Sequence, residues 1–532
     1  MSSSGGYEPL IHRAVAAQAT LRPEATALVH RDDHIAYQTL EAAATSYAAE
    51  LTELGVGVGQ VVPLLLPRSP QLVAVQLAVL KCGAAYANLD RRWPADRIAG
   101  ILELTSPILV AAEGVLPPGR RTVYRPPAED VRAAAARAGA LPPTEVSGSD
   151  PATVFFTSGT TGRPKGVVSP HQAVTRLFGP GRLPGFGTGH ATPQAAPQPW
   201  DMYAFELWGQ LTTGGTTVLV EADHLLPSSL RGLVRTAGVD TLWITTSLFN
   251  LFVDEDPDCF AGLGHVLVGG EKLSPQHVRS FLHRHPGIPL RNGYGPVENC
   301  MLTTTHVLRT EDCDLPGGLP VGRAVPDSTV LVLDPDDRPC PANEPGEICV
   351  AGTGLATRYL GDAELTAEKF PVLELGGAPL RIYRTGDIGL VDDNGVLHFR
   401  GRRDRQVKIS GYRVEMAEIE VTVGGLPGVR DCVALPLTDS EGRVHRLALF
   451  YLTDLDGREE SAGVDDPLRI RDQLLDLLPG YAVPTIVRGL DRLPITANGK
   501  LDRRALVELA RKSRASRPAK ATRVANRTQA RP

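Results

Sequence analysis

Glycines, hydroxyl side chains and a lysine are concentrated at residues 157–166, where the chain reads TSGTTGRPKG directly after the apolar run ATVFF. Glycines let several backbone N–H groups point at one anion, while the hydroxyls and Lys165 add donors and a positive charge. This composition predicts a phosphate-binding loop. It is not a Walker A loop, because GxxxxGKS/T is absent and the lysine follows a proline. The plainer alternative is a Ser/Thr/Gly turn that follows a strand.

The elements around this loop have the pattern of an α/β protein. Between about residues 10 and 110, helical runs such as LEAAATSYAAELTEL alternate with short apolar runs such as VVPLLL, as in helices packed on a parallel sheet. The alternation resumes from residue 154 to 400, and β-rich runs near 328–400 predict a smaller β subdomain. Residues 114–150 are rich in Pro, Ala and Arg, and we interpret them as a surface connection.

A final unit begins near GRRDRQVKISGYRVEMAEIE, with strands predicted at VKIS, DCVALP and LALFYL and a helix at about 466–478. From residue 511 the chain carries eight Arg or Lys and no acid, which is typical of a disordered tail. We therefore expect an α/β fold in three parts. These are a large N-terminal core at 1–402, a small mobile α+β lid at 403–510, and a basic tail at 511–532.

Composition narrows the class of protein. A chain of 532 residues exceeds one ordinary core, and 42% hydrophobic and 22% charged residues are typical of a globular protein. The net charge of -5 provides no basic field for nucleic acid. No signal peptide or apolar stretch of membrane-spanning length is visible, so we expect no membrane association and a cytoplasmic location. The seven cysteines lack CxxC spacing, which indicates neither a disulfide framework nor a zinc site.

The TSGTTGRPKG loop resembles that of the adenylate-forming superfamily, which includes acyl-CoA synthetases, firefly luciferase and nonribosomal peptide synthetase adenylation domains. Further motifs of that superfamily follow in order over residues 10–506, with Asn88 where LKCGAAYANLD usually has proline. The resemblance implies an AMP-forming ligase that uses ATP and Mg²⁺ to convert a carboxylate into an acyl-adenylate. The other motifs are WDMYAFELWGQLTTGG (200–215), NGYGPVE (292–298), GEICVAGTGLATRYL (346–360), YRTGD (383–387), GRRDRQVKISGYRVEMAEIE (401–420), LPGYAVP (478–484) and NGKLDRRAL (498–506).

The resemblance also implies roles for single residues. Lys500 is the expected catalytic residue, which bridges the substrate carboxylate and the adenylate; NGK alone would indicate a solvated turn lysine. Asp387 suits the two ribose hydroxyls, Tyr294 should stack on adenine, and Glu298 is the expected Mg²⁺ ligand. The expected ATP site comprises Thr157, Ser158, Gly159, Thr160, Thr161, Gly162, Lys165, Gly270, Glu271, Asn292, Gly293, Tyr294, Gly295, Asp387 and Arg402.

Two positions bear on how the reaction proceeds. Asp404 resembles the hinge about which the lid rotates, first placing Lys500 in the site and then admitting a thiol beside Gly411 and Tyr412. A plain surface turn is the alternative for Asp404. Val297 stands where the family usually has threonine, and losing one hydrogen bond to a charged group costs about 1.5–3 kcal/mol. We expect that loss to slow catalysis without abolishing it.

Asp201 falls where peptide synthetases place the aspartate that binds the substrate ammonium, which favours an amino acid. A helix N-cap is the alternative for Asp201, and both roles are compatible. The uncharged pocket predicts a small aliphatic side chain, whether straight or branched. Tyr203 replaces a small residue, so it narrows the pocket or moves the amino group, and a β-amino acid stays open. The pocket positions are Met202, Phe205, Ile244, Leu267, Gly269, Gly293, Met301 and Leu302.

The acceptor thiol is expected on a phosphopantetheinylated carrier protein in natural-product biosynthesis. A carrier domain needs about 80 residues and none follows Lys500, so we expect a separate carrier. An acyl-CoA ligase is the nearest alternative, and Asp201 argues against it. A nonenzymatic adenylate-binding regulator is the other alternative, which intact Lys500, Asp387 and Glu298 disfavour and Val297 favours.

Overall fold

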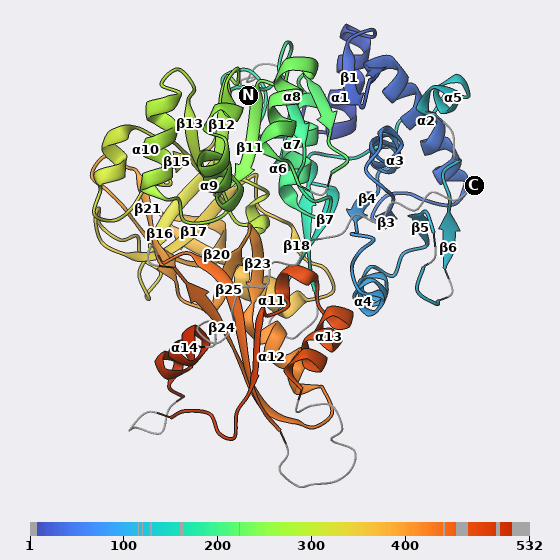
Figure 1. Cartoon of the computed structure of the whole chain (residues 1–532). Coiled ribbons are helices and arrows are strands. Elements are labelled where there is room, and N and C mark those ends of the chain that lie inside the picture. Colours follow the sequence, from blue (N-terminus) through green and yellow to red (C-terminus); the bar gives the residue numbers. More distant parts are fainter. Residues whose placement is uncertain are drawn as a thin grey trace, which may run out of the picture.

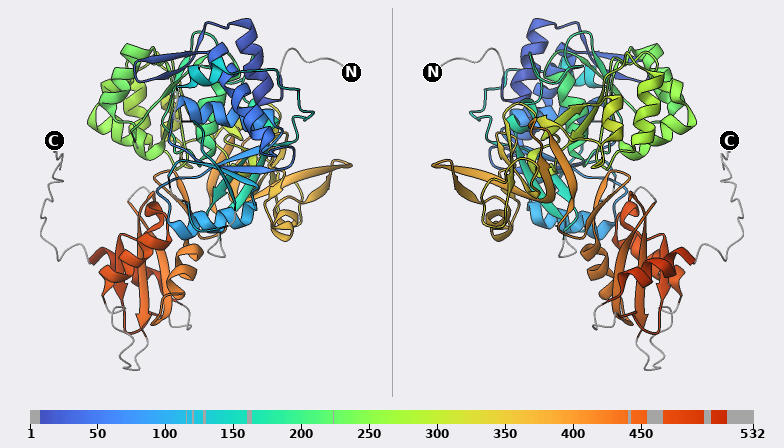
Figure 2. Two further views of the ribbon diagram at one scale, coloured as in Figure 1. Left: turned by 90° about the vertical axis from the view of Figure 1, so that its right-hand side faces the viewer. Right: turned by 90° about the vertical axis from the view of Figure 1, so that its left-hand side faces the viewer.

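The computed structural model describes residues 8–512 except 115, 120, 128–129, 160–163, 223, 440–441, 454–465 and 496–500. A large α/β body lies above a smaller unit of strands and helices, which is formed by the last part of the described chain and is coloured orange to red (Figures 1 and 2). The predicted fold class, a large α/β domain with a small α+β lid, is confirmed. The tail predicted at 511–532 lies outside the described residues from position 513 onward.

The sheet that carries the phosphate loop runs in the order β18-β8-β7-β4-β3-β5-β6. Strands β7 and β8 pair antiparallel, and Thr157 lies opposite Lys165 where the loop leaves the sheet. The surface connection expected at 114–150 is partly wrong, because it contributes edge strand β6 and a helix, α5, that packs on α2. The strands are β3 (Val61–Leu65), β4 (Ala85–Asn88), β5 (Leu109–Ala112), β6 (Thr122–Tyr124), β7 (Pro151–Thr157), β8 (Lys165–Pro170) and β18 (Arg358–Tyr359).

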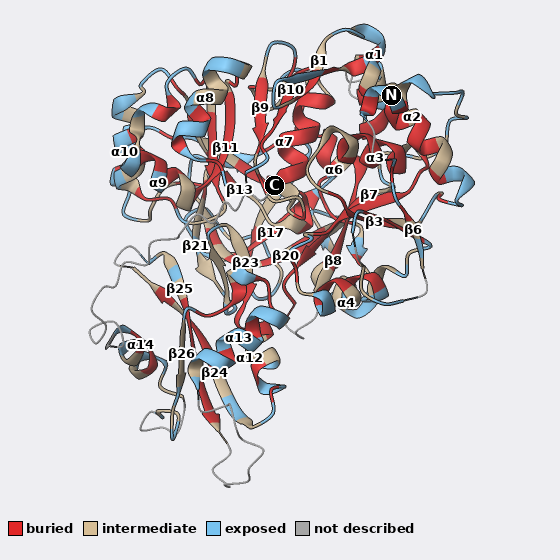
Figure 3. Ribbon diagram, turned by 45° about the vertical axis from the view of Figure 1, so that its right-hand side comes forward, coloured by how far each residue is buried: buried red, intermediate tan, exposed pale blue. Residues whose placement is uncertain are grey.

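Two further sheets flank helix α7, whose side chains are buried from Met202 to Leu211 (Figure 3). One has the order β2-β1-β10-β9, and the other has the order β11-β12-β13-β14-β15. Parallel pairing of β11, β12 and β13 aligns Thr245, Gly269 and Gly293. The strands are β1 (Thr26–His30), β2 (Asp33–Ala36), β9 (Ala191–Gln194), β10 (Thr216–Leu219), β11 (Thr241–Thr245), β12 (His265–Gly269), β13 (Leu290–Tyr294), β14 (Thr304–Val307) and β15 (Arg323–Ala324).

Helices pack on these sheets throughout the body. The helix predicted from LEAAATSYAAELTEL is α2, and its buried face includes Leu40, Tyr47 and Leu51. The body helices are α1 (Ile11–Leu21), α2 (Tyr37–Glu53), α3 (Pro70–Lys81), α4 (Ala95–Thr105), α5 (Val131–Ala136), α6 (His171–Thr175), α7 (Asp201–Leu211), α8 (Pro227–Ala237), α9 (Thr246–Glu255), α10 (Pro275–Arg284) and α11 (Ala363–Lys369). No helix among the described residues is long and apolar enough to cross a membrane.

The β subdomain expected near 328–400 is present as a sheet of order β16-β17-β20-β19, with β21 also paired to β20. Strand β17 is buried from Glu347 to Ala351, whereas β20 alternates buried and partly buried residues from Tyr383 to Gly389. The long strand β20 carries Asp387 toward the site and pairs Asp387 with Arg402 on β21. The strands are β16 (Ser328–Leu333), β17 (Gly346–Gly352), β19 (Val372–Leu375), β20 (Ala378–Val391) and β21 (Leu397–Arg402).

The lid follows β21 and has two sheets. A hairpin, β22–β23, projects toward the body, while β24, β25 and β26 form a sheet covered by helices (Figure 1). Each lid strand and the helix predicted from the sequence are present. The elements are β22 (Gln406–Ile409), β23 (Tyr412–Glu415), α12 (Met416–Gly424), β24 (Val429–Thr438), β25 (Val444–Thr453), α13 (Pro467–Leu477), β26 (Ile486–Gly489) and α14 (Arg503–Lys512).

Glu206 on α7 holds the segment that leads into this helix. Its carboxylate accepts hydrogen bonds from the N–H groups of Ala195 and Ala196 at 2.9 and 2.8 Å. Burial raises the pKa of Glu206 to about 8, because the charged form loses its hydration. The segment after β9 is thereby tied to α7.

We expect Glu206→Gln to flatten the pH dependence of stability. The folded-state pKa of about 8 exceeds the ordinary 4.5, so the folded protein keeps a proton that the unfolded chain releases. This stability is fully present below about pH 4.5 and is lost as the pH rises through about 8. The Tm should therefore fall less between pH 5 and 9 in Glu206→Gln than in wild type or in the exposed control Glu374→Gln; equal slopes would contradict this account.

Candidate active site

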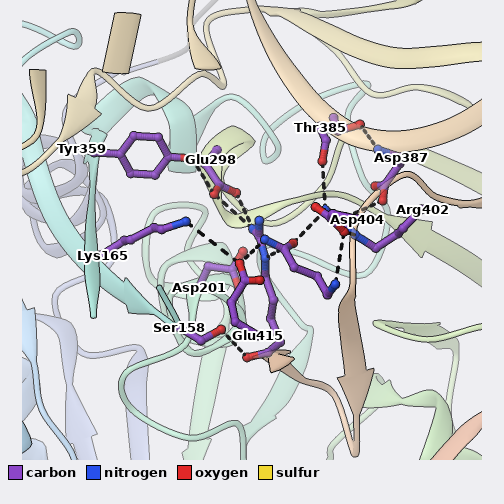
Figure 4. Close-up of polar contacts among 12 residues, drawn as sticks. Ser158, Lys165, Asp201, Glu298, Tyr359, Thr385, Asp387, Arg402, Asp404 and Glu415 are labelled. Carbon is purple, nitrogen blue, oxygen red and sulfur yellow. Dashed lines mark hydrogen bonds and ion pairs between the residues drawn. The ribbon is translucent and has the colours of Figure 1, made fainter. Parts of the chain in front are cut away.

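The lid hairpin meets the phosphate loop at the base of the body. The hydroxyl of Ser158 donates to the carbonyl oxygen of Arg413 at 2.9 Å, and the ammonium of Lys165 lies 4.0 Å from the carboxylate of Glu415 (Figure 4). Burial lowers the pKa of Lys165 and raises that of Glu415. Thr157 is buried at the end of β7. The predicted members Thr160, Thr161 and Gly162 lie outside the described residues.

Glu298, the predicted metal ligand, is a buried carboxylate in the turn after β13. Both of its oxygens accept from the Arg413 guanidinium at 3.0 Å, and the Tyr359 hydroxyl donates to it at 2.8 Å. Burial by itself raises the pKa of Glu298, but the charge of Arg413 and the Tyr359 hydrogen bond outweigh burial and hold the pKa below its ordinary value. The carboxylate is therefore held in the charged form, which a cation requires.

Asp387, the predicted ribose ligand, is buried between Tyr294 and Arg402. The Tyr294 hydroxyl donates to one carboxylate oxygen at 2.5 Å, and Arg402 pairs with the other. Arg402 also donates to Asp404 at 2.7 Å, so one guanidinium joins the ribose position to the predicted hinge. Burial, together with the negative charge of Asp387, raises the pKa of Tyr294 well above its usual value, so its hydroxyl remains a donor.

Asp201 is the first residue of α7, and Trp200 is the N-cap. The N-cap alternative for Asp201 is therefore wrong. One oxygen of Asp201 accepts the N–H of Met301 at 3.0 Å, and Cys300 and Met301 have φ of 47° and 74°, in the left-handed region. Burial raises the pKa of Asp201, so its charged form needs a nearby cation.

Five of the residues predicted to line the pocket belong to one buried hydrophobic cluster. Met202, Phe205, Leu267, Met301 and Leu302 pack together, but Ile244 belongs to the neighbouring cluster. The parallel register places Ile244 beside Val268, whereas Trp243 lies beside Leu267 on the pocket face. Successive side chains of a strand point to opposite faces, so Trp243, and not Ile244, faces the cluster that contains Met202 and Phe205. Trp243 is 9% exposed and belongs to the same cluster as Phe205.

The pocket glycines are required by close packing. A Cβ on Gly269 would lie 2.3 Å from the carbonyl oxygen of Gly293, and one on Gly293 would lie 2.9 Å from Leu302. A Cβ on Gly295 would lie 2.3 Å from the carbonyl oxygen of Met301. Asn292 donates its side-chain amide to the carbonyl of Pro320 at 2.7 Å and so holds the end of β13.

Tyr203 and Asn88, two departures from the family pattern, are connected through Gln76. Tyr203 donates its hydroxyl to Gln76 at 3.1 Å, Gln76 donates to Asn88 at 2.9 Å, and Asn88 donates to the carbonyl of Gln198 at 3.1 Å. Tyr203 is 1% exposed. Its hydroxyl is thus directed into the core, and the expectation that Tyr203 moves the amino group of the substrate has no support here.

The tip of the lid hairpin contacts both the nucleotide and the substrate regions. The N–H of Gly411 donates to Glu271, whose carboxylate also accepts from Ser247 at 2.7 Å. Tyr412 packs edge-on against Trp200, with ring centroids 4.2 Å apart. Gly270 has φ of 91°, and its Cβ position is 3.9 Å from Gly411. The hairpin therefore connects residues expected at the purine with the residue that precedes α7.

Sequence reasoning missed three charged residues of this hairpin, namely Lys408, Arg413 and Glu415. Lys408 lies near Asp201 and Asp387; burial lowers its pKa, and the two carboxylates oppose that effect. The segment VKISGYRVE alternates charged and apolar residues, which was the available signal, but nothing in it identified the distant partners. The predicted Lys500 lies outside the described residues.

Comparisons with known proteins agree with this geometry. The family model for AMP-binding enzymes matches residues 15–360. Tyrocidine synthase 3 of Brevibacillus parabrevis is 34% identical over 92% of this chain, and malpibaldin synthetase of Mortierella alpina is 36% identical over 93%. This chain spans only 7% and 9% of the lengths of those two proteins.

Solved structures show the same architecture. An NRPS protein containing adenylation and PCP domains, bound to a vinylsulfonamide inhibitor, superposes with a TM-score of 0.84 at 32% identity, covering 94% of this chain and 84% of that one. Another structure of such a protein gives a TM-score of 0.80 at 30% identity, covering 96% and 98%. The chain belongs to the AMP-binding enzyme family, whose members form adenylates from ATP. It is an NRPS-type adenylation enzyme, which makes it an AMP-forming ligase.

We expect Gly411→Ala to loosen the hairpin from the body. Gly411 has φ of 83°, and an added Cβ would lie 2.8 Å from Thr245 and 2.9 Å from the Trp200 ring. Hydrogen–deuterium exchange of a peptide covering residues 406–415 should become faster. Gly442→Ala is the matched control, because Gly442 has φ of 78° in the lid with open space around it. Unchanged exchange in Gly411→Ala, or equal acceleration in both variants, would contradict the contact.

Proposed function

We propose that this enzyme activates a compact aliphatic α-amino acid as its aminoacyl-adenylate and passes it to the phosphopantetheine thiol of a carrier protein. The observation that carries the substrate class is Asp201, a recessed carboxylate at the start of α7, beside an apolar cluster. The α-ammonium of an amino acid offsets the burial cost of that carboxylate, whereas a fatty or aromatic acid offers it no cation. The apolar residues around Asp201 then determine which substrate side chains are accepted.

The bulk of the pocket walls favours a small substrate. Trp243, Phe205 and Leu267 fill one face of the cluster with large side chains. Large side chains at these positions favour a compact substrate side chain, straight or branched. Apolar packing discriminates by roughly 1–3 kcal/mol per methylene, so closely related aliphatic acids should be accepted with graded efficiency. A β-amino acid with a similarly small side chain is the alternative within this substrate class.

The first step joins two anions, so the site must supply positive charge. A carboxylate oxygen of the substrate attacks the α-phosphorus of ATP, the bond to the β-phosphate breaks, and pyrophosphate leaves. Asp387 accepts the ribose hydroxyls, Ser158 and Lys165 donate to the phosphates, and Tyr294 stacks on the purine. The role that the family resemblance gives to Lys500 is to neutralise the negative charge shared by the carboxylate and the α-phosphate. Val297 supplies no hydroxyl here, which removes one donor.

Glu298 is suited to a magnesium ion. The described residues contain no cluster of three or more His, Cys, Asp or Glu side chains that could hold a metal by themselves. Mg²⁺ bound with nucleotides typically takes one or two carboxylates and completes its shell with phosphate oxygens and water. Glu298, held charged beside the phosphate loop, fits that role. The ion would neutralise charge on the β- and γ-phosphates.

The second step requires the lid to move. With the Gly411–Tyr412 tip seated against Trp200 and Glu271, the hairpin occupies the position that the family resemblance assigns to thiol transfer. The thiol sulfur then attacks the carbonyl carbon of the adenylate, a thioester forms, and AMP leaves. The PCP-containing relatives support a carrier as the acceptor. An acyl-CoA ligase is the competing function and differs in both substrate and acceptor.

Amino-acid-dependent ATP–pyrophosphate exchange tests the first step. A panel of α-amino, β-amino and nonamino acids should give strong exchange with small aliphatic α-amino acids, and Lys500→Ala should abolish it. Asp201→Asn should lower kcat/KM for the amino acid by roughly two to three orders of magnitude, because breaking a buried charge pair costs about 3–5 kcal/mol. The exposed Asp254→Asn is the control. Exchange with nonamino acids alone would make the enzyme an acyl-CoA ligase.

Trp243 should set the upper size limit of the side chain. Trp243→Ala removes a large wall, so exchange should shift toward longer or bulkier aliphatic and aromatic amino acids, by about tenfold or more in the ratio of kcat/KM values. Ile244→Ala is the matched control from the opposite face of β11 and should leave the order of preference unchanged. If Ile244→Ala changes the preference and Trp243→Ala does not, the assignment of the pocket face is wrong.

A further inference from the structure

One short segment of the lid, residues 413–415, contacts three side chains of the phosphate region, namely Ser158, Lys165 and Glu298. The Ser158 hydroxyl donates to the Arg413 carbonyl oxygen at 2.9 Å. Glu298 accepts the Arg413 guanidinium on both oxygens at 3.0 Å, and Lys165 lies 4.0 Å from Glu415. Figure 4 shows the Lys165 side chain directed at Glu415, with Ser158 and Glu298 on the same side of the body. The lid therefore touches the phosphate site through polar groups at each of these three positions.

The charges that the lid presents to these three groups have the same signs as those of magnesium pyrophosphate. Glu298, assigned above to the metal, receives a cation, whereas Ser158 and Lys165, assigned to phosphate oxygens, receive a carbonyl oxygen and a carboxylate. Glu298 is 1% exposed and Lys165 17% exposed at the side chain, so each is costly to leave without a partner. The same charges cannot serve the lid and the leaving group at once.

We propose that Arg413 and Glu415 form a lid-borne surrogate of magnesium pyrophosphate, so that this arrangement of the lid and Mg²⁺–pyrophosphate exclude one another from the same groups. The inference deepens the proposed function and rests on its assignment of Ser158, Lys165 and Glu298. Arg413 takes the position of the metal on Glu298, and Glu415 with the Arg413 carbonyl takes the position of the phosphate oxygens. Arg413 and Glu415 are thus positioning residues for thiol transfer.

Exclusion orders the two reactions. Pyrophosphate has to leave before the hairpin can seat, and the seated hairpin then prevents pyrophosphate from returning to reverse adenylation. A docked lid lowers the apparent affinity for Mg²⁺–pyrophosphate, because only molecules with an open site can bind it. The apparent affinity is the intrinsic affinity multiplied by the fraction of open molecules. Removing the surrogate must therefore strengthen binding of the leaving group, which is opposite in sign to the loss of an ordinary ligand.

Other contacts hold the lid whether or not the surrogate is present. Arg97 on α4 of the body forms a buried ion pair with Glu418 on α12 of the lid at 2.9 Å, and the Tyr412 ring of the lid packs edge-on against Trp200 of the body, with ring centroids 4.2 Å apart. Variants of Arg413 or Glu415 should therefore shift the equilibrium of the lid while these contacts persist. Arg405 provides a matched control, since it pairs with Glu420 inside the lid.

Isothermal titration of Mg²⁺–pyrophosphate into the full chain provides the test. Arg413→Met and Glu415→Gln should each bind it more tightly than wild type, on the order of three- to tenfold, with Arg413→Lys intermediate and Arg405→Met unchanged. Glu298→Gln should weaken binding. Equal or weaker binding in both Arg413→Met and Glu415→Gln would overturn the proposal, because these residues would then be bystanders or direct phosphate ligands.

Lid position provides a second readout that needs no substrate. Spin labels at Leu226→Cys and Leu468→Cys, both exposed sites, report the body-to-lid distance after Cys340 and Cys432 are changed to serine. Mg²⁺–pyrophosphate should shift the distance distribution, while Mg²⁺ alone or inorganic phosphate should not; an unchanged distribution overturns the proposal. Both readouts are independent of amino-acid-dependent exchange, so failure of the proposed substrate class and failure of the surrogate are separately visible.

Discussion

Three carboxylates recessed from water, Asp201, Glu298 and Asp387, determine how the rest of this structure is arranged. A carboxylate in such a place is stable only opposite a cation or several hydrogen-bond donors. The body supplies donors in the Met301 N–H and the Tyr359 and Tyr294 hydroxyls. The cations come from β21 and the lid hairpin, through Arg402, Lys408 and Arg413. Charge pairing between Arg413 and Glu298 therefore joins the lid to the body at this site.

The family and the fold class could be predicted because they depend on local composition and on motif order. The phosphate loop combines glycines, hydroxyls and a lysine within ten residues, and the β-strand before it is a short apolar run. The helix and strands of the lid likewise follow from periodicity, and each appears at its predicted place. The assignment of Asp387, Tyr294 and Glu298 to nucleotide and metal stays a prediction, although the structure places them near one another.

Other features depend on register and on distant partners, which a motif does not contain. Trp243 and Ile244 are adjacent on β11, so their side chains point to opposite faces of the sheet. A motif alignment that is wrong by one residue therefore selects the wrong face. Arg413 contacts Glu298, 115 positions away in the sequence, and the carbonyl of Arg413 contacts Ser158, 255 positions away. Single-sequence patterns do not pair positions so far apart. The contribution of 114–150 to a sheet edge was missed because its apolar runs are short.

The chain of hydrogen bonds from Tyr203 through Gln76 and Asn88 to Gln198 joins the helix that begins with Asp201 to an element more than a hundred residues earlier. Its members are buried or nearly so, and each satisfies the next. Helix α7 is consequently not a module that can be exchanged by itself between related enzymes. A transplant that carries a small residue at position 203 would leave the amide of Gln76 without its phenol partner in the core. Residues of α7 and of the α3–β4 segment that take part in these hydrogen bonds therefore have to be exchanged together.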